Sequence, residues 1–135
     1  MKSPVVLIVE DNAAMRELLT NRLKTEDIEV RAAPDMATGL AELRTGDINL
    51  LLLDLLLGPE AGKSGADLVR QARLDNTTNI NSLPIVVLSD WLDPAAVLGE
   101  VLSADQYDYF HKPSTSLDTI AQHIKQKLHG QTPAR

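Results

Sequence analysis

Five short strand-like runs, most of them strongly apolar, divide this chain, and more polar segments with helical spacing separate them. The runs cover residues 5–9, 28–33, 48–53, 84–88 and 107–111. Continuous runs of this length, rich in Val, Ile and Leu, are typical of strands that are buried on both faces of a parallel sheet. The run at 48–53 is the most apolar and is expected to be a central strand. The run at 28–33 is interrupted by charged residues, which suits a strand at the edge.

Apolar residues recur at intervals of three and four after each run, which predicts five amphipathic helices. The residues expected to cap helices are Asp11 or Asn12, Asp35, and Asp93 followed by Pro94. Gly46 and Gly130 are expected to end the second and the last helix. The third helix is expected over about 66–74, and the polar stretch 75–83 is expected to be a loop. The fourth helix, which follows Pro94, is expected to extend to Leu102.

Alternating strands and helices predict an α/β fold, in which a doubly wound parallel sheet carries helices on both faces and the crossovers are right-handed. A chain of 135 residues is expected to form one domain. We assign this domain to residues 1–130 and treat 131–135 as a short tail.

Composition excludes several classes of function. The chain has no cysteine, so it cannot use disulfides, thiolate catalysis or cysteine-ligated zinc. A net charge of −6 argues against electrostatic capture of nucleic acid, and 3% aromatic residues argue against base stacking. No stretch has the length of a membrane-spanning helix, and the first four residues are too short for a signal peptide. The default expectation is a soluble cytoplasmic protein that binds neither nucleic acid nor membranes.

Chemically active side chains follow four of the five apolar runs. Glu10 and Asp11 follow the first run, Asp54 the third, Ser89 the fourth and Lys112 the fifth. Ligands of open parallel sheets bind beyond the carboxyl ends of the strands, where these groups would meet. Each residue alone has a structural explanation, such as a helix cap or a surface lysine. Together, three carboxylates, a hydroxyl and an ammonium favour a site for a divalent cation, such as Mg²⁺, and a phosphoryl group.

The order and spacing of these residues resemble the motif of a known family. The Glu10–Asp11 pair, Asp54, Ser89 and the Lys112–Pro113 pair are similar to the signature of receiver domains of the two-component response regulator family. The resemblance covers essentially the whole chain and is to the single-domain, chemotaxis-regulator-like kind. It implies a flavodoxin-like receiver fold with strand order 2-1-3-4-5 and five helices.

The resemblance also implies a role for each group. Asp54 is expected to be the phosphoacceptor, and Ser89 and Lys112 are expected to contact the phosphoryl oxygens. The implied Mg²⁺ ligands are Glu10, Asp11, Asp54 and the backbone carbonyl of Leu56. Tyr109 occupies the aromatic switch position that works with Ser89. The Lys112–Pro113 peptide bond is expected to be cis.

By the same resemblance, a histidine kinase or histidine phosphotransfer protein is expected to donate the phosphoryl group, and a downstream effector protein to read the switched conformation. The protein is then not an enzyme, although slow self-dephosphorylation is expected. It is expected to be a monomer or a phosphorylation-dependent homodimer. The start at Met1 and the helix end at Gly130 favour a stand-alone regulator over a domain cut from a longer chain.

Three other functions compete with this interpretation. A phosphatase of the haloacid dehalogenase type needs a second Asp two residues after the nucleophile, where this chain has Leu56. A flavodoxin-like cofactor binder needs a small-residue phosphate loop after the first strand, and Glu10 and Asp11 there would repel a phosphate. A degenerate receiver, acting as a phosphorylation-independent binding module, stays open as the alternative.

The chain departs from the family pattern at four places. Asp90 follows Ser89, where the family has a small residue, and is expected to slow phosphoryl entry or change phosphate lifetime unless it points to solvent. Trp91 is the only tryptophan, and we expect either partial burial or a partner contact. The loop from Asp54 to Gly65 is longer than usual, and 105–108 carries about two extra residues.

Overall fold

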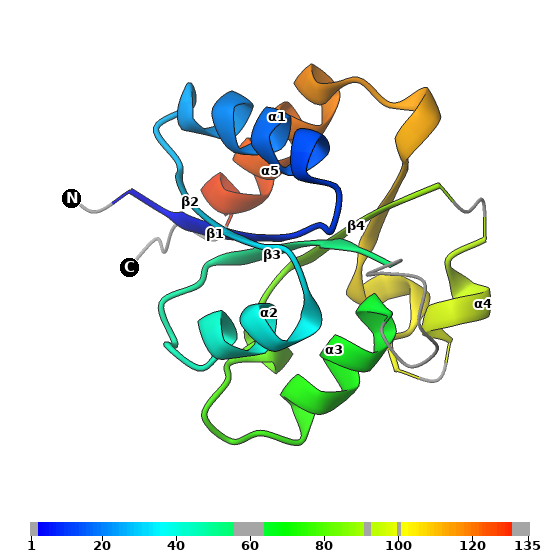
Figure 1. Ribbon diagram of the computed structural model, residues 1–135. Coiled ribbons are helices and arrows are strands. Elements are labelled where there is room, and N and C mark those ends of the chain that lie inside the picture. The colour runs from blue at the N-terminus through cyan, green and yellow to red at the C-terminus, as the bar shows by residue number, and fades with distance from the viewer. Residues whose placement is uncertain (1–2, 56–63, 91–92, 100, 131–135) are drawn as a thin grey trace.

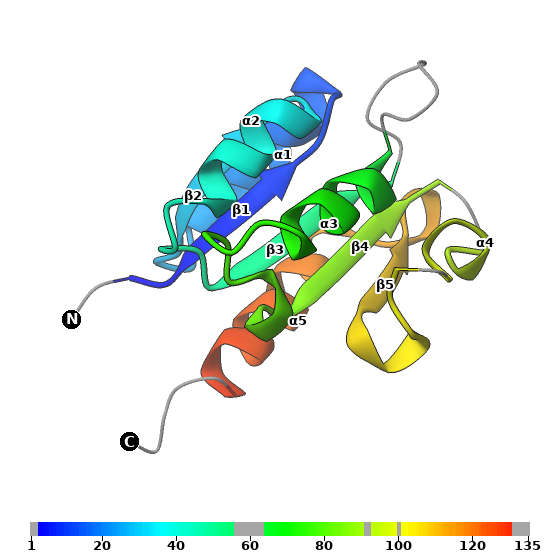
Figure 2. The ribbon, with the colours of Figure 1, turned by 90° about the horizontal axis from the view of Figure 1, so that it is seen from below.

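The fold contains one five-stranded parallel sheet (Figures 1 and 2). The computed structural model describes residues 3–55, 64–90, 93–99 and 101–130. The strands are β1 (Val5–Val9), β2 (Glu29–Ala33), β3 (Leu50–Asp54), β4 (Ile85–Ser89) and β5 (Asp108–His111). They pair in the order β2-β1-β3-β4-β5. The predicted α/β class, strand order and edge position of β2 are therefore confirmed.

Helices cover both faces of the sheet. Their bounds are α1 (Ala13–Lys24), α2 (Met36–Leu43), α3 (Gly65–Arg73), α4 (Ala95–Leu98) and α5 (Leu117–Gly130). In Figure 1, α1 and α5 lie above the sheet, and α2 and α3 lie below it. Three 3₁₀ turns complete the described elements, at Ile80–Ser82, Ala104–Gln106 and Lys112–Ser114. Within the described residues, no helix combines the length and apolar character needed to cross a membrane.

Two hydrophobic cores lie on the two faces of the sheet. Successive side chains of a strand point to opposite faces. In β1, Leu7 and Val9 therefore pack with the α2 and α3 side, whereas Val6 and Ile8 pack with α1 and α5. Because both faces of the central strands are covered, β1, β3 and β4 are buried along their whole length. This explains why these strands read as uninterrupted apolar runs.

Polar side chains define where three helices begin. Asn12 Oδ1 accepts a hydrogen bond from the backbone N–H of Met15 at 2.9 Å, so Asn12 rather than Asp11 caps α1. Asp35 caps α2, as predicted. Ser64, which the sequence pattern did not single out, forms a capping box with Asp67 at the start of α3. Capping by Asn12 leaves the Asp11 carboxylate available to the site described below.

The fourth helix is shorter than expected. It ends at Leu98, its N-cap is Pro94, and it has no side-chain cap, so the predicted capping by Asp93 is wrong. Gly99 follows at once, and glycine is a poor helix former. Leu102 is still buried on the α3 side of the sheet, and its backbone N–H donates a hydrogen bond to the carbonyl oxygen of Leu98.

The expected insertion of about two residues falls in the region before β5, where a capping box between Ser103 and Gln106 closes the 3₁₀ turn Ala104–Gln106 and β5 begins at Asp108. After β5, the expectation of a cis bond before Pro113 is wrong, because no cis peptide bond occurs in the described segments. Pro113 lies in the first positions of a 3₁₀ turn, where the fixed φ of a trans proline fits.

Candidate functional site

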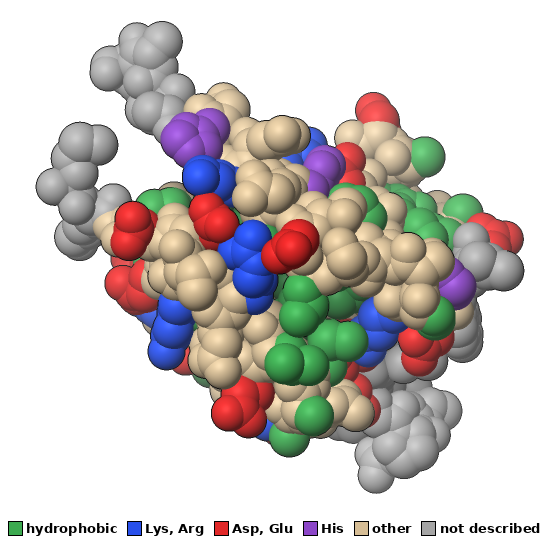
Figure 3. Space-filling model, turned by 90° about the horizontal axis from the view of Figure 1, so that it is seen from above, with side chains coloured by type: hydrophobic (Ala, Val, Ile, Leu, Met, Phe, Trp, Pro, Cys, Tyr) green, Lys and Arg blue, Asp and Glu red, His purple; other side chains and the backbone are tan. Residues whose placement is uncertain are grey.

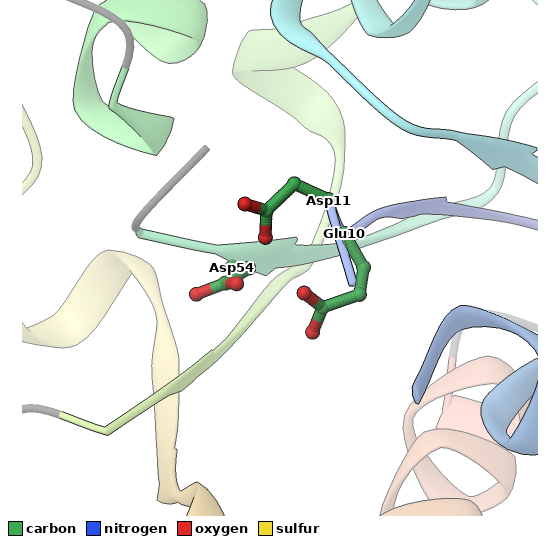
Figure 4. A group of neighbouring side chains, drawn as sticks. All are labelled: Glu10, Asp11 and Asp54. Atoms are coloured by element: carbon green, nitrogen blue, oxygen red, sulfur yellow. The ribbon is translucent and has the colours of Figure 1, made fainter. Parts of the chain in front are cut away.

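Three carboxylates meet beyond the carboxyl ends of β1 and β3. The register pairs Val9 with Leu53, so the residues that follow them, Glu10 and Asp54, lie side by side. Asp11 comes from the next position of the loop after β1, and Figure 4 shows its carboxylate turned toward that of Asp54. One oxygen from each of the three carboxylates lies within 4.8 Å of the others. The structure therefore brings the predicted acidic trio together.

Lys112 lies between the two buried carboxylates. Its Nζ is 2.7 Å from Glu10 Oε1 and 3.1 Å from Asp54 Oδ2. Glu10 and Asp54 are only 2% and 5% exposed. Two neighbouring carboxylates removed from water are costly unless a cation compensates them. The ammonium of Lys112, carried there by the turn after β5, supplies that compensation.

Burial and charge act in opposite directions on the pKa values of this group. Burial alone raises the pKa of Glu10, but its contacts with Asp54 and Lys112 outweigh burial, so the pKa lies below its ordinary value. Burial likewise lowers the pKa of Lys112, but the contacts and charges of Glu10 and Asp54 raise it above its ordinary value. The ion pair between Glu10 and Lys112 is therefore charged at neutral pH.

Asp11 behaves differently from its neighbour. Burial and the adjacent Glu10 raise the pKa of Asp11 above its ordinary value. The single ammonium of Lys112 thus does not compensate all three acids, and the excess negative charge lies at the solvent-exposed side, where Asp11 is.

The donor set fits a hard divalent cation. Glu10 Oε2 accepts a hydrogen bond from the backbone N–H of Asn12 at 3.1 Å, but the buried Oε1 has no hydrogen-bond partner in the described part of the chain. Oε1 instead forms the 2.7 Å ion pair with Lys112. Carboxylate oxygens with spare lone pairs are the ligands that Mg²⁺ prefers, and it retains several waters. Leu56, expected to add a carbonyl ligand, lies outside the described residues.

Two residues that the sequence analysis did not assign to the site hold its backbone. Arg16 Nη1 donates to the carbonyl oxygen of Glu10 at 2.8 Å and thereby fixes the loop after β1. A Cβ on Gly65 would lie 2.6 Å from the carbonyl oxygen of Asp54, so only glycine lets α3 begin against this strand end. The sequence pattern marks Gly65 only as the end of a loop. Nothing in the hydrophobic pattern marks Arg16.

Ser89 and Tyr109 lie together on the next two strands. Ser89 ends β4 and is fully buried. The hydroxyl of Tyr109 donates to the backbone carbonyl of Ser89 at 3.5 Å. Burial and the negative charge of Asp90 raise the pKa of the Tyr109 hydroxyl. Asp90 itself is exposed and does not belong to the acidic trio of the described residues, and Trp91 lies outside the described residues.

Comparison with known proteins identifies the family of this chain. The family model of the response regulator receiver domain matches residues 6–125. A probable transcriptional regulatory protein of Picosynechococcus is 35% identical over 86% of this chain and 46% of its own length. The DNA-binding response regulator MtrA of Mycolicibacterium paratuberculosis is 33% identical over 86% of this chain and 48% of its own length. The chain thus spans about half the length of these curated relatives.

Solved structures show the same fold. A CheY-like receiver domain protein from Methanospirillum hungatei has a TM-score of 0.75 at 23% identity and covers 96% of each chain. The chemotaxis protein CheY4 of Vibrio cholerae has a TM-score of 0.72 at 18% identity, over 92% of this chain and 98% of its own. At these identities the structural likeness supports the fold alone. The match over residues 6–125 and the relatives above 30% identity establish that the chain belongs to the response regulator receiver domain family.

Proposed function

We propose that this receiver domain accepts a phosphoryl group on Asp54 from a histidine kinase or a histidine phosphotransfer protein. Phosphorylation-dependent signalling is the role of the family. The observation that supports Asp54 as the acceptor is its place in the buried trio, with Lys112 at 3.1 Å and the acids of the β1 loop beside it. The second candidate, a binding module independent of phosphorylation, has no supporting feature among the described site residues.

The proposed reaction is a direct transfer between two proteins. A carboxylate oxygen of Asp54 attacks the phosphorus of a phosphohistidine and forms an O–P bond. The P–N bond of the donor breaks, and the released imidazole nitrogen takes up a proton. Such transfers depend on in-line positioning and on neutralising charge over the phosphoryl oxygens. Lys112 carries positive charge at the acceptor oxygen, and as a flexible point charge it can follow the phosphoryl oxygens.

We infer that the acidic trio holds Mg²⁺. Glu10, Asp11 and Asp54 would be its ligands, together with the backbone carbonyl of Leu56. When bound, the cation would neutralise charge on the carboxylates and on the incoming phosphoryl oxygens. The spare lone pairs of Glu10 Oε1 and the exposed position of Asp11 support this assignment.

The proposed response is a movement of Ser89, Tyr109 and Lys112. The phosphoryl group adds negative charge and acceptor oxygens at the end of β3, which favours contacts from the Ser89 hydroxyl and from Lys112. A shift of Ser89 would end the contact of its backbone with Tyr109 and change the face that α4, β5 and α5 form. Such a shift moves the balance between existing conformations. An effector protein, or a second copy of the chain, would read that face.

The donor is proposed to dock beside α1. Figure 3 shows the face formed by α1 and α5, where charged side chains of both signs surround a group of hydrophobic ones. Leu18 of α1 is 53% exposed.

Water attack on the phosphorus of phospho-Asp54 would break the O–P bond and release phosphate, which gives the slow self-dephosphorylation. The proposed location of the protein is the cytoplasm.

A small phosphodonor tests the proposal. The protein is incubated with phosphoramidate and Mg²⁺, and its intact mass is measured. One phosphoryl group with the acid and base lability of an acyl phosphate is expected, and it should be absent in Asp54→Asn and in EDTA. Asp47→Asn, which changes an exposed surface aspartate, is the matched control and should be phosphorylated normally. No mass gain in the wild type would favour the phosphorylation-independent binding module, and a gain that survives Asp54→Asn would exclude Asp54 as the acceptor.

A further inference from the structure

His111 contacts both the segment that follows Ser89 and the turn that carries Lys112. It is the last residue of β5, it pairs with Ser89 in the sheet, and it immediately precedes Lys112. Its ring nitrogen Nε2 lies 3.1 Å from the backbone carbonyl oxygen of Asp90, across the gap between the two strands. Its other ring nitrogen, Nδ1, lies 3.0 Å from Ser114 Oγ. The imidazole therefore contacts one segment on each side of the site.

The chemistry of the partners determines which nitrogen carries the proton. A backbone carbonyl only accepts hydrogen bonds, so Nε2 must be the donor to Asp90. Ser114 Oγ lies 3.0 Å from Nδ1, and its hydroxyl also lies within donor reach of the His111 backbone carbonyl oxygen at 3.4 Å. Each ring nitrogen thus has a polar partner, and these two contacts hold the orientation of the ring.

Two side chains of β5 hold consecutive carbonyls of the chain after β4. Tyr109 and His111 are two residues apart, so they project from the same face of the strand. Tyr109 contacts the carbonyl of Ser89, and His111 contacts that of Asp90. The Ser89 side chain is fully buried, so the position of this backbone limits where its hydroxyl can reach.

The same ring is tied to the turn that carries Lys112. The 3₁₀ turn Lys112–Ser114 begins directly after His111. Thr115 Oγ1 donates to the carbonyl oxygen of His111 at 2.7 Å, and Ser114 contacts the ring. The imidazole thus links the backbone beside Ser89 to the turn of Lys112, and fixes the separation of their two segments.

We propose that His111 is a positioning residue for phosphoryl transfer, which sets the separation of the Ser89 and Lys112 segments through its hydrogen bond to the Asp90 carbonyl. The inference rests on the proposed phosphorylation of Asp54. The ring of His111 contacts Asp90 and Ser114, so it would act through the two segments that carry them. Losing one hydrogen bond with a net value of about 1 kcal/mol corresponds to about a fivefold change in rate.

The test compares His111→Ala, His111→Gln and the control His129→Ala, which changes an exposed histidine of α5. Rate constants for phosphorylation by phosphoramidate are measured by intact mass at saturating Mg²⁺. Mg²⁺ affinity is measured by calorimetry and stability by urea unfolding. We expect His111→Ala to react about fivefold more slowly, with unchanged Mg²⁺ affinity. His111→Gln should restore most of the rate, because its side-chain N–H can reach the Asp90 carbonyl.

The outcomes separate this inference from the proposed function. A His111→Ala rate equal to or above that of the wild type overturns the positioning role, as does a slow rate that His111→Gln does not restore. A parallel loss of Mg²⁺ affinity would also overturn it. If His111→Ala does not fold, Ser114→Ala removes only the outer contact of the ring and should slow transfer by about twofold; an unchanged rate counts against the inference. A wild type that takes up no phosphoryl group rejects the proposed function itself.

Discussion

Replacing Lys112 by methionine should destabilise the domain more than the same replacement of a surface lysine does. The change keeps most of the apolar stem and removes the ammonium that lies 2.7 Å from Glu10 and 3.1 Å from Asp54. These carboxylates would stay buried without a cation. Removing one partner of a buried ion pair typically costs about 3–5 kcal/mol. With a urea m-value of about 2 kcal/mol/M, the unfolding midpoint should fall by about 2 M.

Lys125→Met is the matched control. Lys125 Nζ lies 3.0 Å from Glu26 Oε1, a distance like those of Lys112, but its side chain is 43% exposed. An exposed pair of this kind contributes about 0–1 kcal/mol. Urea unfolding of both variants in EDTA at pH 7 compares a buried with an exposed ion pair. Equal midpoints for the two variants would refute the argument that burial makes the Lys112 contacts important.

The pH dependence of the free energy of unfolding provides a second test of this prediction. The folded-state pKa of Glu10 lies below its ordinary value, so its contribution is present above the unfolded pKa of 4.5 and is lost as pH falls through the folded pKa. The folded-state pKa of Lys112 is raised, so its contribution is complete below 10.5 and is lost as pH rises through the folded value. The cost of Lys112→Met should therefore be largest near neutral pH and shrink in acid. A cost that stays constant down to pH 3 would contradict this.

Three further predictions concern the backbone, a surface acid and the cation. Gly65→Ala should lower the free energy of unfolding by about 1–3 kcal/mol, because the new Cβ would lie 2.6 Å from the Asp54 carbonyl oxygen. Gly130→Ala, whose new Cβ would have nothing within 4 Å, is the control and should be nearly neutral in urea unfolding. Hydrogen bonds from Thr77 and the ion pair with Arg44 lower the pKa of Asp75 to about 2, so Asp75→Asn should remove a stabilisation present above pH 3.8 and lost toward pH 2; identical pH profiles of thermal unfolding would reject this. Added Mg²⁺ should raise the melting temperature of the wild type by mass action but have a much smaller effect on Asp11→Asn, as scanning calorimetry can show.

The positions of the strand ends predicted that the acidic trio would form, but not its environment. Glu10, Asp11, Asp54 and Lys112 each stand at or just after the end of a strand, and parallel strands place such ends at one edge of the sheet. Their meeting was therefore predictable. Their environment was not, because burial of Glu10 at 2% and the position of one ammonium between two carboxylates depend on how the turn after β5 folds back.

Elements that depend on local competition were predicted less well. The fourth helix was expected to reach Leu102, but it ends at Leu98, because Gly99 weakens it while tertiary packing still buries the later side chains. The bond before Pro113 was expected to be cis from family resemblance, and it is trans in a 3₁₀ turn. Asp11 and Asn12 were equal candidates for the first cap until the hydrogen bond to Met15 distinguished them.

The sequence by itself determined the alternation of strands and helices, the doubly wound sheet and the order of the chemically active residues. These properties follow from the periodic order of apolar and polar side chains, which can be seen directly in the sequence. Only the tertiary structure decided that Lys112 lies between Glu10 and Asp54, that Gly65 lies against the Asp54 backbone and that His111 reaches the Asp90 carbonyl. These contacts join residues that are far apart in sequence, and their distances depend on the packing of complete elements against one another.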